Sequence, residues 1–182
     1  MELNKKIKVL NTPLSSEDVL NLKAGDVIYI SGKIITARDL AYKRILSQGP
    51  PFDMSGLIIY NCGPLAVRRD NKWRIVSAGP TTSSRMEHAI PKILEITGAK
   101  GIIGKGSLGK IASEALKKFS AFYGLFPGGA GALAAKSIVN VENVYWLNLG
   151  IPEAIWVLNV RMLGPIIVAI DAHGRRIFMN LI

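Results

Sequence analysis

Short runs of apolar and β-branched residues recur along the chain and predict a sheet. Turn-forming residues bound most of these runs, as is typical of strands. The expected strands are Ile7–Leu10, Val27–Ile30, Leu57–Tyr60, Trp73–Val76, Gly101–Ile103, Val144–Leu147, Ala154–Val160 and Ile166–Ile170. Residues 67–76, with Asp70 and Asn71 at their centre, are typical of a hairpin.

Apolar residues repeat with helical spacing in three stretches, which predict helices over Ala37–Ser47, Ser83–Thr97 and Leu108–Phe119. Pro91 lies inside the second stretch. Because proline has no amide N–H to donate, we expect a kink there or the start of a second segment. The Gly- and Ala-rich residues Gly128–Lys136 predict a fourth, closely packed helix.

This mixture of strands and helices indicates an α/β fold with a mixed sheet rather than a regular parallel βαβ array. The 182 residues have the size of one domain and contain neither an internal repeat nor a linker-like tract. We therefore expect a single domain over residues 1–182, with residues 1–24 as an N-terminal arm.

The composition excludes several classes of protein. With 49% hydrophobic and 20% charged residues, the chain is expected to fold rather than to be disordered. Its longest apolar stretch, residues 120–135, is interrupted by Gly124, Pro127 and the Gly128-Gly129 pair, which argues against a membrane span. The N-terminus lacks the apolar segment of a secretory signal. We expect a soluble, cytoplasmic protein without a membrane partner.

Cysteine and histidine are too few for most metal or nucleophilic sites. Cys62 is the single cysteine, so this chain alone cannot form a disulfide, a cysteine-rich zinc site or the ligand set of an iron-sulfur cluster. His88 and His173 are the two histidines and leave little material for a catalytic triad. No metal site is expected in this chain.

The formal net charge of +10 predicts attraction to anions, which include nucleic acid, an acidic partner and small carboxylates or phosphates. The 23 lysines and arginines are spread along the chain in runs no longer than pairs. No zinc-finger spacing or aromatic RNA-binding motif accompanies them. This distribution favours a solvated basic surface over nucleic-acid binding.

The segment Gly104-Lys105-Gly106-Ser107-Leu108-Gly109 has the G-x-G-x-x-G spacing of a phosphate-binding turn between a strand and a helix. A dinucleotide site also requires an acidic residue about 20 positions further on. None occurs between Glu114 and Glu142. Two interpretations stay open: an anion site that uses Lys105 and free backbone amides, and a plain structural turn.

Two further segments combine cations with hydroxyl groups. In Ala78-Gly79-Pro80-Thr81-Thr82-Ser83-Ser84-Arg85-Met86, Arg85 follows Thr81 by four residues, so both side chains can face one pocket. Simple helix capping by one of the hydroxyls is the alternative. In the other segment, Arg38 and Asp39 open a predicted helix, where an exposed helical turn is the simpler interpretation. We assign the segment from Leu125 to Lys136 to close packing.

Taken together and in this order, the segments SGKIITARDLAYKR, AGPTTSSRM, GKGSLGK, FPGGAGALAAK, GIPEAIWVLNV and IIVAIDAHG resemble a known family. The chain is similar, over roughly residues 25–171, to the β subunit or C-terminal domain of class I iron-sulfur fumarate hydratases and the related tartrate dehydratases. AGPTTSSRM is the most specific of these motifs.

The resemblance implies a mixed-sheet, three-layer β/β/α "swivelling" domain. It also implies a hetero-oligomer, in which an α subunit with three cysteines holds a 4Fe-4S cluster and this β subunit completes the dicarboxylate site. Carried over by motif, Arg38, Arg85 and Lys105 hold the carboxylates of the substrate, and Thr81 is the base. Sequence alone does not separate Thr81 from Thr82 in that role.

Two positions depart from the family pattern: Tyr42 stands where a histidine is expected, and Ser107 replaces a common glycine. These two departures leave the identity of the substrate undecided. Our leading hypothesis is the β subunit of a two-subunit fumarate hydratase, a hydro-lyase of the tricarboxylic acid cycle that interconverts fumarate and malate. The alternatives are a tartrate dehydratase β subunit and a non-catalytic anion- or nucleotide-binding module.

Overall fold

The computed structural model describes residues 7–177. Within them, the strands are β1 (Lys8–Thr12), β2 (Val27–Thr36), β3 (Ile58–Tyr60), β4 (Leu65–Arg69), β5 (Lys72–Ser77), β6 (Gly101–Gly104), β7 (Phe122–Leu125), β8 (Ile138–Tyr145) and β9 (Ile155–Ile170). The α-helices are α1 (Ser16–Leu20), α2 (Asp39–Gln48), α3 (Ile90–Thr97), α4 (Lys110–Lys118) and α5 (Gly131–Ser137). Two 3-10 helices, η1 (Ser83–Ala89) and η2 (Leu147–Leu149), complete the chain. The expected mixed α/β class is confirmed.

Seven of the strands form one mixed sheet in the order β1-β2-β3-β6-β7-β9-β8. Strands β1, β2, β3, β6 and β7 run parallel to one another, whereas β9 is antiparallel to β7, β8 and β2. Because β9 pairs with both β7 and β2, the sheet closes into a ring of five strands. Strands β4 and β5 form a separate hairpin.

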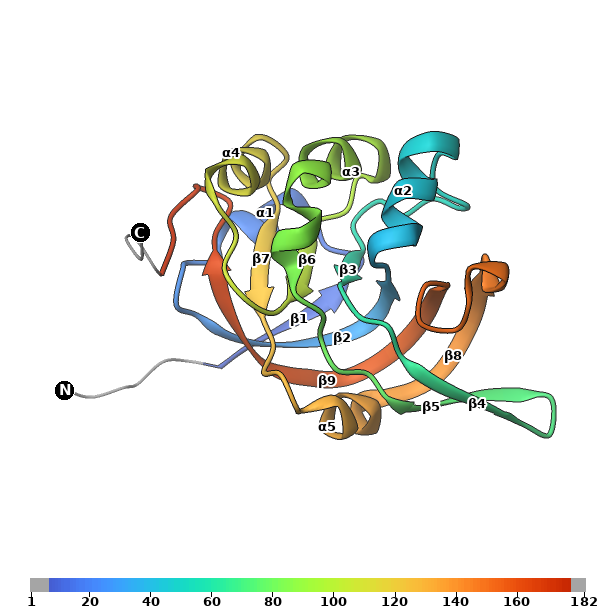
Figure 1. Cartoon of the computed structure of the whole chain (residues 1–182). Coiled ribbons are helices and arrows are strands. Elements are labelled where there is room, and N and C mark those ends of the chain that lie inside the picture. The colour runs from blue at the N-terminus through green and yellow to red at the C-terminus, as the bar shows by residue number, and fades with distance from the viewer. Residues whose placement is uncertain (1–6, 178–182) are drawn as a thin grey trace.

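Apolar side chains fill two cores on opposite sides of the sheet, as the alternation of side chains along a strand requires. In β3, Ile58 and Tyr60 belong to one core and Ile59 to the other. Figure 1 shows α2, α3 and α4 together on one side, where their buried residues pack around Ile59. On the other side, α5 and the hairpin close the core around Trp156. The ring of Trp73 packs edge-on against that of Trp156, with the ring centroids 5.1 Å apart.

Several predicted elements are confirmed, including the helix over residues 37–47 and the hairpin, whose turn residues Asp70 and Asn71 both have positive φ. A second helical segment, α3, begins at Ile90, so that Pro91 marks the start of a segment rather than a kink. Pro91 lies in the first turn of α3, where its missing N–H costs nothing because that group has no partner within the helix.

Other predictions were wrong in extent. The two strands expected at 154–160 and 166–170 are one strand of 16 residues, β9. Register shifts against β2 and a positive φ at Met162 bend β9 without breaking it, as bulges do. Strand β7 was not predicted, and β8 begins at Ile138 instead of Val144.

The stretch expected as an N-terminal arm carries regular structure where it is described. Strand β1 pairs in parallel with β2, and α1 begins with a capping box made by Ser15 and Asp18. Residues 1–6 of the expected arm lie outside the described residues. Among residues 7–177, none of the helices has the length and apolar character that crossing a bilayer requires.

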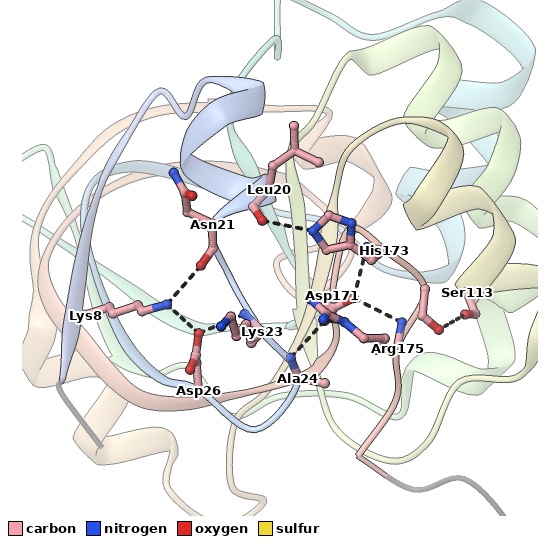
Figure 2. Close-up of polar contacts among 11 residues, drawn as sticks. Lys8, Leu20, Asn21, Lys23, Ala24, Asp26, Ser113, Asp171, His173 and Arg175 are labelled. Carbon is pink, nitrogen blue, oxygen red and sulfur yellow. Dashed lines mark hydrogen bonds and ion pairs between the residues drawn. The ribbon is translucent and has the colours of Figure 1, made fainter. Parts of the chain in front are cut away.

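Asp171 ties the end of β9 to the loop before β2 (Figure 2). Its fully buried carboxylate accepts backbone N–H groups from Ala24 at 3.1 Å, His173 at 2.9 Å and Arg175 at 3.0 Å. The Nε of Arg175 adds a contact of 2.7 Å to the same carboxylate. Burial opposes ionisation, but these donors outweigh it and hold the pKa of Asp171 below its usual value.

Asp171→Asn should destabilise the fold, because the variant loses the charge and turns an NH2 donor toward N–H donors. We expect the free energy of unfolding to fall by about 1.5 to 3 kcal/mol at pH 7. Because the pKa of Asp171 is lower in the folded state, its carboxylate stabilises the fold at pH values above the pKa of the unfolded state. This stabilisation is lost as the pH falls through the pKa of the folded state. The difference should therefore shrink below about pH 4.

Urea unfolding at a series of pH values measures both effects. Exposed Glu114, which is paired weakly with Lys110, provides the control variant Glu114→Gln. An Asp171→Asn chain as stable as this control at pH 7 would contradict the assignment.

Candidate functional site

Residues 78–83 connect β5 to η1 and pass between the ends of β3 and β6. The N–H of Thr81 donates to the carbonyl of Asn61 at 2.7 Å, and the Thr81 carbonyl accepts the N–H of Lys105 at 3.2 Å. The N–H of Ser83 then donates to the carbonyl of Lys105 at 3.0 Å. These bonds place Thr81 at the carboxyl ends of two neighbouring parallel strands, which is where α/β sheets commonly bind ligands.

Two glycines permit this close approach. A Cβ on Gly104 would collide with Oγ of Ser83, which is fully buried. A Cβ on Gly131 would lie 2.9 Å from the backbone nitrogen of Gly79, while the N–H of Ala78 donates to the Gly131 carbonyl at 3.0 Å. The packing role expected for the glycine-rich segment is thus confirmed at Gly131.

Arg85 links the Thr81 hydroxyl to a carboxylate of α2. Its Nη2 lies 3.0 Å from Oγ1 of Thr81 and 2.8 Å from Oδ2 of Asp39. The Nε of Arg85 donates to Oδ1 of Asp39 at 3.2 Å, so the ion pair is bidentate. The structure therefore brings Thr81 and Arg85 together, as their spacing predicts.

Arg38 belongs to the same cluster through two carboxylates. Its Nε lies 2.9 Å from Oε1 of Glu153, an ion contact without hydrogen-bond geometry, and 3.5 Å from Oδ2 of Asp39. The other oxygen of Glu153 accepts the N–H of Leu40 at 2.8 Å. Glu153 thus caps α2, whose own N-cap residue, Arg38, makes no capping bond.

Lys105 joins the cluster through its backbone, whereas its side chain turns another way. A Cβ on Gly128 would lie 3.6 Å from Cδ of Lys105, so the lysine runs along the Phe126–Gly128 turn. The turn borders a mainly apolar hollow of about 610 Å³ that also includes Lys105 and Pro165. In the part of the chain that the structure describes, Lys105 has no carboxylate partner. It remains available to an anion.

Two buried polar side chains, Tyr42 and Asn61, support the segment that carries Thr81. Tyr42 and Asn61 exchange long hydrogen bonds of 3.3 and 3.4 Å. Burial raises the pKa of Tyr42, so its hydroxyl stays neutral. Tyr42 holds Asn61, whose carbonyl holds Thr81. The tyrosine at the position where the family pattern has histidine is therefore a supporting residue in this chain.

Cys62 lies beneath the site and is fully buried. Burial raises the pKa of its thiol to about 12, against an opposing effect of Arg38, so it stays protonated at neutral pH. Among residues 7–177, no group of three histidine, cysteine, aspartate or glutamate side chains is placed to hold a metal ion. The described residues therefore do not fit an iron-sulfur cluster.

The glycine turn at 104–109 is not open to a phosphate in the way its sequence suggests. Helix α4 begins at Lys110, and Oε1 of Glu87 accepts the N–H of Ala112 at 3.3 Å. The same oxygen would lie 2.7 Å from a Cβ on Gly109. A carboxylate of the chain already occupies the helix N-terminus, where a phosphate would otherwise bind.

Three of the four predicted site residues, Thr81, Arg85 and Arg38, are thus connected by side-chain contacts through Asp39. No sequence pattern marks the two carboxylates, Asp39 and Glu153, as parts of the site. Asp39 has the pattern of an exposed helical turn. The contact of Glu153 with Leu40 spans 113 positions, and no sequence pattern indicates it.

Residues 2–181 match the family described as the fumarase C-terminus. The chain belongs to this family. It is 41% identical over 172 residues to the β subunit of L(+)-tartrate dehydratase from Escherichia coli K12, with 93% of this chain and 86% of that subunit covered. A Geobacillus stearothermophilus protein provisionally named class I fumarate hydratase is 37% identical over 178 residues, which cover 97% of this chain and 34% of that protein. The family is one of hydro-lyase subunits, and the resemblance seen in the motifs is confirmed.

Gly104→Ala should destabilise this member of the fumarase C-terminal family, because its new methyl group collides with Ser83. We expect a loss of about 1 to 3 kcal/mol in the free energy of unfolding, as for other overpacked cores. Adding Ser83→Ala removes the colliding oxygen and should restore part of the loss. Gly128→Ala, where a Cβ meets nothing closer than 3.6 Å, is the matched control. Thermal or urea unfolding compares the variants; equal stability of Gly104→Ala and the control would show that the approach is not tight.

Proposed function

We propose that this chain is the β subunit of a two-subunit hydro-lyase that adds water to, or removes it from, a four-carbon dicarboxylate. Hydration of fumarate to malate is the reaction expected from the sequence motifs. The observation that carries the proposal is the Thr81 hydroxyl held 3.0 Å from an arginine that lies in one cluster with Arg38. Lys105 adjoins it through the backbone.

In this proposal, the three cations bind the two carboxylates of the substrate. Arginine offers a planar fork of N–H groups that matches a carboxylate, and lysine offers a point charge. Arg38 and Arg85 lie on the α2 side of Thr81, whereas Lys105 extends toward Gly128. Cations that extend from the cluster in different directions suit a substrate with a carboxylate at each end.

Thr81 acts as the base that takes a proton from the carbon next to a carboxylate. A free threonine hydroxyl is a very poor base, so its deprotonated form must be stabilised. An N–H of Arg85 points at Oγ1, and this contact favours the oxyanion. Thr82 is less suited as the base, since no hydrogen bond of its hydroxyl is found among residues 7–177. Its methyl carbon Cγ2 lies beside Gly106, where a Cβ would be 3.7 Å away.

In this proposal, the partner is an α subunit that holds a 4Fe-4S cluster, as the resemblance to the family implies. Support comes from the names of the relatives, which are β subunits. The cluster would supply Lewis-acid chemistry, and this chain the carboxylate contacts and the base. We also propose that residues 1–182 are one domain of the three-layer β/β/α swivelling type, located in the cytoplasm and without a nucleic-acid partner.

L(+)-tartrate is the second candidate substrate, and the relatives support it at least as strongly as fumarate. The Escherichia coli subunit is a separate chain of similar length, whereas the fumarate hydratase relative is about three times longer than the matched region. The non-catalytic nucleotide-binding alternative loses support, because Glu87 occupies the N-terminus of α4.

Reconstitution with an α subunit tests the function directly. We expect the purified β chain to be iron-free and inactive on fumarate, malate and L(+)-tartrate, because Cys62 alone cannot hold a cluster. The complex with an iron-loaded α subunit should turn over at least one of them. Iron analysis and an absorbance assay of each substrate decide between the candidates. Full turnover by the lone chain, or none by the loaded complex, would contradict the proposal.

Thr81→Ala should lower kcat of the reconstituted enzyme by about a hundredfold or more and change KM much less, because a proton-transfer group acts mainly in the transition state. Thr82→Ala is the neighbouring control and should keep most of the turnover. Deuterium exchange at the methylene carbon of malate, measured with the cluster intact, reports the proton transfer itself. Exchange by Thr81→Ala at the unmutated rate would eliminate Thr81 as the base.

A further inference from the structure

Asp39 occupies the centre of the charged cluster, although no motif assigns it a role. It accepts two hydrogen bonds from Arg85, at 3.2 and 2.8 Å, and its Oδ2 lies 3.5 Å from Nε of Arg38. The hydrogen bonds from Arg85 hold the pKa of Asp39 below its usual value. Asp39 is therefore a carboxylate at neutral pH and touches both arginines expected to bind substrate.

The donors of Arg85 show what this contact does. A guanidinium has five N–H groups, which lie in one plane. Three of them are engaged: Nε with Asp39, one N–H of Nη2 with Asp39 and the other with Thr81. The two N–H groups of Nη1 have no acceptor among residues 7–177. Asp39 thus binds the edge of the guanidinium formed by Nε and Nη2, and it leaves the corner at Nη1 for another anion.

Asp39 is itself held in place by the fold. It is the first residue of α2, and the next residue, Leu40, donates its N–H to Glu153 at 2.8 Å. The side chains of Asp39 and Arg85 are 32% and 46% exposed. An ion pair this exposed contributes little to stability. Its effect should appear in the orientation of Arg85 rather than in the stability of the fold.

We infer that Asp39 is a positioning residue: it clamps the guanidinium of Arg85 so that one N–H points at Thr81 and the Nη1 corner faces the substrate carboxylate. This inference rests on the proposed function for its consequence in turnover. The clamp itself is a property of the isolated chain. The two parts can therefore be tested separately.

The first experiment uses the full-length β chain alone and follows the Nε–H signal of Arg85 by NMR, assigned through its loss in Arg85→Lys. We expect this proton to exchange with solvent several-fold faster in Asp39→Asn than in the unmutated chain. Asp26→Asn is the matched control, because Asp26 is a partly buried aspartate that pairs with Lys8 away from the site (Figure 2). Unchanged exchange in Asp39→Asn would overturn the inference, whatever the chain catalyses.

The second experiment uses the reconstituted enzyme and a double-mutant cycle. Asp39→Asn should lower kcat by about ten- to a hundredfold, with a smaller change in KM and an unchanged melting temperature. In the Arg85→Ala background the same change should cost less than about twofold, because Asp39 acts through Arg85. Asp39→Glu, which restores the charge, should recover part of the loss.

The outcomes separate the inference from the proposed function. An active enzyme in which Asp39→Asn behaves like Asp26→Asn, or loses as much activity with Arg85→Ala as without it, overturns the positioning role and leaves the function standing. A loaded complex that turns over no dicarboxylate contradicts the proposed function. The exchange measurement then still decides whether Asp39 clamps Arg85.

Discussion

The backbone hydrogen bonds of residues 78–83 determine where everything else in the site lies. They add this segment to the ends of β3 and β6, with Thr81 bonded to Asn61 on one side and Lys105 on the other. Arg85 then returns to Thr81 from one turn of η1. The arrangement requires Gly104, because any side chain there would displace Ser83. A single tight backbone approach thus places both the hydroxyl and two of the cations.

The contacts of Arg38 and Glu153, the other part of the cluster, depend on a different part of the fold. Glu153 follows η2 in the connection from β8 to β9, and it reaches α2 because β9 runs antiparallel beside β2, which leads into that helix. Asp39 joins the halves, since it contacts Arg38 and Arg85. The closed ring of strands therefore matters for the chemistry: it brings carboxylates from one part of the chain to cations from another.

The elements that depend on local pattern could be predicted, and those that depend on long-range pairing could not. Helix α2 and the hairpin follow from apolar spacing and turn residues nearby in sequence. The continuity of β9 does not follow from local pattern, because a proline such as Pro165 is expected to end a strand. Only the pairing of β2 with β9 on both sides of Pro165 shows that the strand continues. The same holds for the site. The spacing of Thr81 and Arg85 indicates their contact, whereas the pairing of Asp39 with Arg85 spans 46 positions and leaves no local signal.

Exposure of the cluster bears on how the proposed base can work. The Arg85 side chain is 46% exposed in this chain, so water competes for its N–H groups and screens its charge. An oxyanion on Thr81 would gain little under those conditions, since stabilisation of this kind is strong where water is excluded. Under the proposed function, the α subunit therefore has a task besides holding the cluster: it must cover Thr81 and Arg85. Under that function, the β chain would supply an oriented set of charges, and enclosure by the partner would make that set strong enough for a threonine to accept a proton.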